Sequence, residues 1–303
     1  MWNSPHSRPL AKYPRTPHLE GSRLQPGDSA DDQVPLQALA GRHVVIEEKL
    51  DGANCGLSFD EGGELLLQSR GHYLCGGASE RQFNWLKPWA QAHAARLLGR
   101  LEDRWLLFGE AMFAKHTVFY DQLPHWLLEF DVMDRRSGQF LSTPRRQALL
   151  AGLPLVSVPV LYAGPMPTEP RLLWSLLRPS LAKSNLWRQR FEEQVAREGL
   201  PLDLCWQQTN PGDRAEGLYL KVENADFVEQ RFKLVRPDFL QTILDSGSHH
   251  LARPLLPNRL VEGVDLYAAT PGVPWQDLGL RTLEGLEALR ASLNEKQEKR
   301  RRS

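Results

Sequence analysis

Short apolar segments separated by turn-forming residues begin at His43 and set the limits on what this chain can fold into. The first three are residues 44–50, 53–59 and 64–69, and the turn sequence Asp60-Glu61-Gly62-Gly63 joins the last two. Segments of this length bounded by Gly and Asp are typical of strands joined in hairpins. Further segments of the same kind are residues 104–112, 126–133, 216–223 and 228–235. Together they predict a hairpin-rich, antiparallel sheet.

Helical patterns fall between these segments without regular alternation. Residues 143–152 carry Pro in the first turn of a predicted helix and end at Gly. A second predicted helix has Ser184 as its N-cap, ends at Gly199 and carries the apolar stripe Trp187, Phe191 and Val195. Because strands and helices do not alternate as in βαβ units, the sequence predicts the α+β class rather than a doubly wound parallel sheet.

The two ends of the chain differ from the strand-rich part. Residues 1–42 are rich in Pro, Arg, His and Asp and show little periodicity, which predicts an arm packed on the core. After Pro237 a Pro-containing linker leads to a helical stripe of Leu283, Leu286, Leu289 and Leu293 and a basic tail. We therefore predict an arm over 1–42, a main domain over 43–240 and a small helical C-terminal region over 241–303.

Composition limits the class of protein. The 303 residues are 41% hydrophobic, which is ample for a core, and the 37 acidic residues balance the 37 basic ones. A nucleic-acid partner would therefore be held by a local patch of charge. The three cysteines lack the paired spacing of a zinc site or a disulfide framework. No apolar run approaches a membrane span and Met1 to Pro9 lack a signal-peptide core, so we expect a cytoplasmic protein with no membrane partner.

Lys49 ends the first apolar segment, within the sequence EKLDGAN. A lysine amine with its ordinary pKa of about 10.4 is protonated at neutral pH and is a poor nucleophile. Burial beside other cations would lower the pKa of Lys49 and make it a candidate covalent nucleophile. Considered alone, such a lysine is more often an ordinary surface residue at a strand end.

Five further clusters carry residue types that nucleotide transfer through a lysine would need. Arg70 in SRG offers a guanidinium for a phosphate or ribose oxygen, and Glu110 in FGE offers a carboxylate. Phe130 in EFD has a face on which a purine could stack. EGLYLK contains a carboxylate and a lysine, and RFK places Arg231 and Lys233 on one side of a strand.

The order EKLDGAN, SRG, FGE, EFD, EGLYLK and RFK resembles the six collinear motifs of the covalent nucleotidyltransferase superfamily of polynucleotide ligases and mRNA capping enzymes. The resemblance extends from Lys49 to Lys233 and is greatest to RNA ligases of the RNA ligase 2-like type. It implies the nucleotidyltransferase fold, with antiparallel sheets flanked by helices. Residues 43–240 would be the adenylation domain, followed by the small helical extension.

The resemblance also implies an activity. Lys49 would attack the α-phosphate of ATP to form a lysyl-adenylate, the AMP would pass to a 5′-phosphate of RNA, and a 3′-hydroxyl would then displace it. Mg²⁺ or Mn²⁺ would be the cofactor, and an end-healing kinase or phosphatase would supply the RNA ends in repair. Carried over by motif, the catalytic residues are Lys49, Lys221 and Lys233. The nucleotide-binding residues are Glu47, Glu48, Asn54, Arg70, Glu110, Phe130, Glu216, Lys221, Arg231 and Lys233, and the metal ligands are Glu110 and Glu216.

Two departures from the family pattern keep alternatives open. Arg231 stands where a lysine is usual, which preserves charge but changes geometry. The seventy residues after Lys233 leave little room for the OB barrel of DNA ligases and capping enzymes, which favours an RNA ligase. The alternatives are a DNA ligase, a GTP-dependent capping-type enzyme, or a catalytically inactive nucleotide- or RNA-binding module.

Structural roles are the alternative for several of these residues. Phe130 could pack in the core, and Glu110 and Glu216 could form ion pairs with the lysines. His116 and His125 lack metal-ligand spacing, so we expect structural roles for them. The arm sequence Lys12-Tyr13-Pro14-Arg15 resembles a segment that precedes the nucleophile in bacterial relatives. The sequence leaves open whether this segment contacts nucleotide or only packs.

Overall fold

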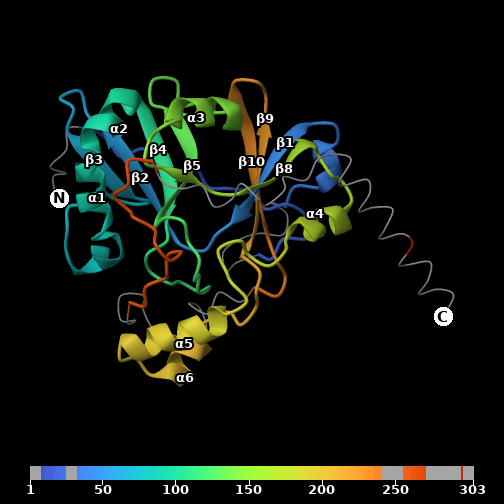
Figure 1. The fold of residues 1–303 in the computed structure, drawn as a ribbon. Coiled ribbons are helices and arrows are strands. Elements are labelled where there is room, and N and C mark those ends of the chain that lie inside the picture. Colours follow the sequence, from blue (N-terminus) through green and yellow to red (C-terminus); the bar gives the residue numbers. More distant parts are fainter. Residues whose placement is uncertain (1–7, 25–32, 240–254, 271–294, 296–303) are drawn as a thin grey trace.

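The computed structural model describes residues 8–24, 33–239, 255–270 and 295, and its centre is a ten-stranded sheet (Figure 1). The strands run in the order β3-β2-β4-β5-β6-β10-β9-β1-β8, with β7 beside β5. The β5–β7 pairing is parallel and the other pairings are antiparallel. The strands are β1 (His43–Lys49), β2 (Ala53–Phe59), β3 (Leu65–Ser69), β4 (Trp105–Ala111), β5 (Leu127–Asp134), β6 (Phe140–Leu141), β7 (Val156–Ser157), β8 (Val160–Pro165), β9 (Gly217–Glu223) and β10 (Phe227–Val235).

Short helices surround the sheet. They are α1 (Leu86–Ala92), α2 (Ala94–Leu101), α3 (Thr143–Leu150), α4 (Pro170–Leu176), α5 (Trp187–Arg197) and α6 (Leu202–Gln207), with 3₁₀ turns η2 (Leu36–Leu39) and η3 (Ala78–Phe83). In Figure 1, α1 and α2 cover the β2–β4 side, α4 lies on the β8 side, and α5 and α6 form a pair below the sheet. The predicted α+β class is confirmed. In the part of the chain that the structure describes, no helix has the length and apolar character needed to cross a membrane.

The predicted strands agree with the observed ones to within one residue at each end, because the alternation of apolar residues sets them locally. The second predicted helix differs at its start. It begins at Trp187, and Ser184 lies in the turn before it, where its Oγ donates to Asp121 over 2.5 Å and accepts the N–H of Leu186. The serine therefore ties the helix to a neighbouring loop instead of capping it.

Apolar residues pack in several clusters, two of which lie on the two halves of the sheet. On the β2–β4 half, Leu57 and Leu107 pack in one cluster with Trp89 of α1. On the β9–β1 half, Ile46 and Leu220 pack in another cluster that includes residues of α4 and η2. Both faces of β1 are buried, so Lys49 lies at the end of a strand that is held rigidly by its neighbours.

The link between β1 and β2 crosses from one half of the sheet to the other. β1 lies between β9 and β8, whereas β2 lies between β3 and β4. The Asp51 carboxylate holds this link by accepting the N–H groups of Thr117 at 2.6 Å and Val118 at 2.8 Å. A Cβ at Gly52 would lie 2.8 Å from a backbone oxygen of β4, so a larger residue does not fit there. The Asp-Gly pair thus fixes where Lys49 and the start of β2 lie.

Segments outside the predicted main domain pack against it. In the arm, the Lys233 N–H donates to Pro17 and the Leu19 N–H donates back to Lys233, so that this part of the arm runs beside β10. Residues 255–270 form bridges and turns on the core, and Asn258 donates to the Met112 carbonyl at 2.7 Å. The predicted leucine stripe of residues 283–293 and the basic tail lie outside the described residues. The division into three regions therefore stays a prediction.

Candidate active site

Two cavities that share part of their walls lie at the end of β1. The smaller has a volume of about 130 Å³ and the larger about 780 Å³. Lys49, Asn54, Glu110, Tyr13 and Tyr219 line both, so the two form one continuous site. Of the other predicted residues, Glu47, Glu48 and Phe130 line the smaller cavity, and Arg70, Glu216 and Lys233 line the larger one. The fold therefore brings most of the residues predicted from the motifs to one place.

The surroundings of Lys49 are acidic, which corrects the expectation of a cationic cluster. Lys49 Nζ lies 2.5 Å from Glu216 Oε2 in an ion pair. Burial alone would lower the pKa of Lys49, but the charges of Glu216, Glu110 and Asp51 outweigh it and raise the pKa above its ordinary value. The expected depression of the Lys49 pKa is thus wrong for this arrangement. The amine is a protonated cation held by Glu216.

Burial raises the pKa of both Glu110 and Glu216. Burial raises the pKa of Glu110 to about 7, Lys49 opposes this rise, and Glu216 and Asp51 add to it. Burial likewise raises the pKa of Glu216, against the opposing effect of Lys49. Glu110 Oε1 also accepts the N–H of Gly52 at 3.1 Å. Two carboxylates that are difficult to ionise thus lie beside the lysine, where a further positive charge would stabilise their ionised forms.

Glu47 and Glu48 lie on opposite faces of β1, and the structure separates their environments. Glu47 shares the face of Lys49, and its carboxylate pairs with Arg146 at 3.0 Å and Lys221 at 2.9 Å. Glu48 accepts a hydrogen bond of 2.5 Å from Ser180. Both residues line the smaller cavity, and it is there that either could contact a nucleotide.

Glu48 gives the fold a pH dependence. Burial raises the pKa of Glu48 to about 7 from an ordinary 4.5, although hydrogen bonds from Ser180 and Leu181 oppose the rise. The unfolded chain loses this proton first, so stability falls as pH rises from about 4.5 through 7. Between pH 5 and pH 8 we expect the free energy of unfolding of wild type to fall by up to about 3 kcal/mol relative to that of Glu48→Gln. Urea denaturation of both proteins at the two pH values measures this, and an unchanged difference would contradict it.

Beneath the site lies a buried network of charges. Lys221 pairs with Glu47 and with Asp131 at 3.2 Å, and it donates to the Phe130 carbonyl. Arg231 Nε lies 3.2 Å from the same Asp131. Burial alone would raise the pKa of Asp131, but Lys221 and Arg231 hold it below its ordinary value. Among the described residues that line the two cavities, neither Lys221 nor Arg231 is found, so their predicted contact with nucleotide lacks direct geometric support.

Arg146 completes this network and was missed at the sequence level. Its side chain is fully buried, with Glu47 at 3.0 Å and Glu129 at 3.6 Å. It lies in α3, which the sequence marks only as an ordinary short helix. No local signal distinguishes it from a solvated arginine, because its partners are far away in the chain.

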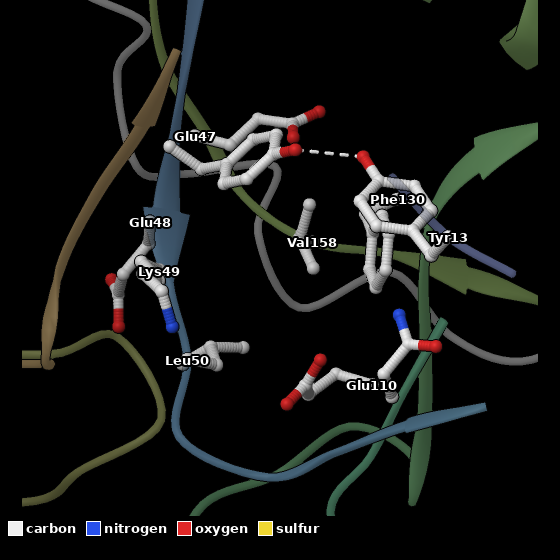
Figure 2. Close-up of a pocket in the computed structure, with 10 residues that line it drawn as sticks. Tyr13, Glu47, Glu48, Lys49, Leu50, Glu110, Phe130 and Val158 are labelled. Carbon is white, nitrogen blue, oxygen red and sulfur yellow. Dashed lines mark hydrogen bonds between the residues drawn. The ribbon is translucent and has the colours of Figure 1, made fainter. Parts of the chain in front are cut away.

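Aromatic side chains form one wall of the smaller cavity. Phe130 lines it and also packs in the core, so the two interpretations of this residue are compatible. Tyr13 of the arm meets Phe130 edge to face, with ring centroids 5.3 Å apart, and shares a hydrogen bond of 2.7 Å with Tyr219 (Figure 2). The arm sequence is therefore part of the site wall, a role that the sequence left open.

The remaining predicted residues differ in how they are held. Asn54 pairs with Glu110 across β2 and β4, and its buried side-chain oxygen has no hydrogen-bond donor among the residues described. Arg70 is exposed at the rim of the larger cavity. His116 also lines this cavity and bonds Gln82 at 2.9 Å, whereas His125 is buried. Within the described ranges, no three side chains of His, Cys, Asp or Glu are grouped to hold a metal.

The chain is similar to known RNA ligases in sequence and in structure. A protein-family model described as RNA ligase matches residues 42–235. The chain is similar to a solved structure of Naegleria gruberi RNA ligase with PPi at 18% identity and a TM-score of 0.46, covering 78% of this chain and 64% of that one. A mutant of the Naegleria enzyme with ATP and Mn is 17% identical, with a TM-score of 0.45, and the match covers 78% of this chain and 61% of that one. An archaeal ATP-dependent RNA ligase is 16% identical, with a TM-score of 0.44, and the match covers 75% of this chain and 48% of that one.

This chain thus spans less than two thirds of the length of each of these solved proteins. Comparison with curated proteins gave no significant match. At TM-scores below 0.5 the structural similarities carry no argument about activity, and the family model decides the assignment. Its match covers well over half of the chain and confirms the resemblance drawn from the six motifs, so the chain belongs to the RNA ligase family.

Proposed function

We propose that this protein is an ATP-dependent RNA ligase that joins 3′-hydroxyl and 5′-phosphate ends in RNA repair. The observation that carries the proposal is the convergence of Lys49, Glu110, Glu216, Lys233 and Arg70 on one cavity. These side chains come from separate strands and loops, and their types suit a lysine nucleophile, phosphate oxygens and a divalent cation. Membership in the RNA ligase family supports the same conclusion.

In the proposed reaction the Lys49 amine forms a P–N bond with the α-phosphorus of ATP as the bond to the β-phosphate oxygen breaks and pyrophosphate leaves. Lys49 must first leave its ion pair with Glu216 and lose a proton. Burial of Lys49 favours the neutral amine, whereas the charges of Glu216, Glu110 and Asp51 favour the protonated one. Lys233, on the wall of the same cavity, would stabilise charge on the phosphoryl oxygens.

The smaller cavity suits the nucleoside part of ATP. Its wall contains the rings of Phe130, Tyr13 and Tyr219, which provide apolar faces for a purine. The Asn54 side-chain oxygen is buried without a donor among the described residues, and a ribose hydroxyl would supply one. A nucleotide with its base here would extend its phosphates into the larger cavity, since Lys49 borders both.

The donor set fits Mg²⁺ or Mn²⁺. Glu110 and Glu216 supply carboxylate oxygens, which these ions prefer, and burial raises the pKa of both groups. Nucleotide sites hold Mg²⁺ through one or two carboxylates together with substrate phosphates, so two protein ligands suffice. When bound, the ion would offset negative charge on the phosphate oxygens.

Intact mass spectrometry tests the proposal directly. After incubation with ATP and Mg²⁺ or Mn²⁺, we expect the protein to gain the mass of one adenylyl group, and nicked RNA to be sealed. Parallel reactions with GTP and with nicked DNA separate a capping-type enzyme and a DNA ligase from an RNA ligase. A protein that binds ATP but gains no adduct with any of these would instead be a non-catalytic binding module.

A further inference from the structure

The N-terminal arm lines the site although it lies outside the part of the chain that matches the family model. That match begins at residue 42, whereas Tyr13, Pro14, Arg15 and Thr16 all line the larger cavity. Four consecutive residues on the wall of one cavity mean that the arm passes along it. The arm therefore belongs to the site by position.

Contacts on both sides of Arg15 fix the backbone there. Tyr13 is buried, and its hydroxyl donates to Asp131 at 2.5 Å and bonds Tyr219 at 2.7 Å. The Thr16 hydroxyl lies 3.1 Å from the same Tyr219 oxygen. Arg15 lies between these two anchors, so the arm cannot swing away from the cavity without breaking both.

The strand next to the arm carries the cation predicted to act on phosphate. The backbone of Lys233 bonds Pro17 at 2.9 Å and Leu19 at 3.0 Å, so the arm and β10 are joined at this residue. Arg15 lines the same cavity as Lys233 and, at its rim, Arg70. Arg15 is exposed, so a ligand in the cavity can reach it.

We propose that Arg15 binds a phosphate group in the larger cavity and that the arm exists to hold it there. The inference rests on the proposed function and extends it to a residue outside the six motifs. A guanidinium can engage two phosphate oxygens at once, which suits it to this role. The phosphate is either that of the bound triphosphate or that of the RNA 5′ end, and the two steps of the reaction distinguish them.

The test compares wild type with Arg15→Ala, Arg15→Lys and the control Lys12→Ala. Lys12 is an exposed cation on the same arm, and among the described residues it is not one that lines the cavity. Adenylation is measured against ATP concentration, and sealing of RNA that already carries a 5′-adenylate is measured against RNA concentration. ATP affinity is measured separately by calorimetry.

Contact with the triphosphate predicts that Arg15→Ala weakens ATP binding about tenfold or more, as expected for a charged hydrogen bond, and leaves sealing of adenylated RNA unchanged. Contact with RNA predicts that the KM for RNA rises by a similar factor and ATP affinity is retained. In both cases Arg15→Lys should lose less affinity than Arg15→Ala, because lysine keeps the positive charge but cannot bind two phosphate oxygens as the guanidinium does.

Equal behaviour of Arg15→Ala and Lys12→Ala in all three measurements would overturn the inference. A loss of every activity together with a lowered melting temperature would also overturn it, because it would show that Arg15 only holds the fold. If wild type binds ATP but forms no adduct, the proposed function fails. The tenfold difference in ATP affinity then still decides the role of Arg15.

Discussion

Replacing Lys49 by methionine is expected to abolish the adenylyl adduct, with a loss of at least about a thousandfold in the rate of its formation. Methionine keeps most of the side-chain length but cannot form the P–N bond. The variant should still bind ATP, since the aromatic wall of the smaller cavity and Lys233 are unchanged. Mass spectrometry after incubation with ATP and Mg²⁺, with calorimetry for binding, measures the two effects separately.

Lys183 provides the matched control for this experiment. Burial lowers the pKa of Lys183 to about 7, so by protonation alone it is a better nucleophile than Lys49. It lies 3.4 Å from the Trp187 ring centre and donates to the Gly212 carbonyl, and it is not among the described residues that line the cavities. Lys183→Met should therefore still accept AMP. Labelling that survives in Lys49→Met and disappears in Lys183→Met would show that the nucleophile is the wrong lysine.

Replacing Lys221 by methionine is expected to lower the free energy of unfolding by about 3–5 kcal/mol, because it leaves buried carboxylates without their cation. The side chains of Lys221 and of its partners Glu47 and Asp131 are essentially inaccessible to solvent. Chemical denaturation measures the change. The expected loss is in stability alone. The molecules that remain folded should therefore form the adenylyl adduct at nearly the wild-type rate.

A double variant separates this account from a direct catalytic role of Lys221. Glu47→Gln removes one of the carboxylates that Lys221 neutralises, so Lys221→Met combined with Glu47→Gln should recover part of the lost stability. If Lys221→Met were as stable as wild type and yet unable to form the adduct, Lys221 would act on the nucleotide as the motif implied.

Seven of the ten strands, all except β6, β7 and β8, could be predicted from sequence because their signals are local. Each shows its own apolar alternation and its own turn residues, and these do not depend on what lies beside it. The neighbours of each strand could not be predicted in this way. β1 pairs with β8 and β9, which follow more than a hundred residues later, and no periodicity in residues 43–49 indicates those partners.

The same distinction holds for the site. The motifs placed Lys49, Glu110 and Glu216 together, but the charge around the lysine depends on which side chains surround it in space. Lys49 is opposite Gly217 on β9, so Glu216 is close to it. Lys221 is opposite Val45, about 13 Å further along the strand, and lies beneath the site. A sequence motif that lists both residues cannot distinguish these positions.

The place of β1 in the sheet also has a consequence during protein synthesis. When residues 1–200 have left the ribosome, Lys49 is already present. β9, which flanks it on one side and precedes the strand that anchors the arm, has not yet been made. The nascent polypeptide at that stage lacks Glu216, Lys233 and the hydroxyl partner of Tyr13. Under the proposed function, the wall of the site is therefore complete only after β9 and β10 have been made, and products that terminate before β9 would carry Lys49 without Glu216 and Lys233.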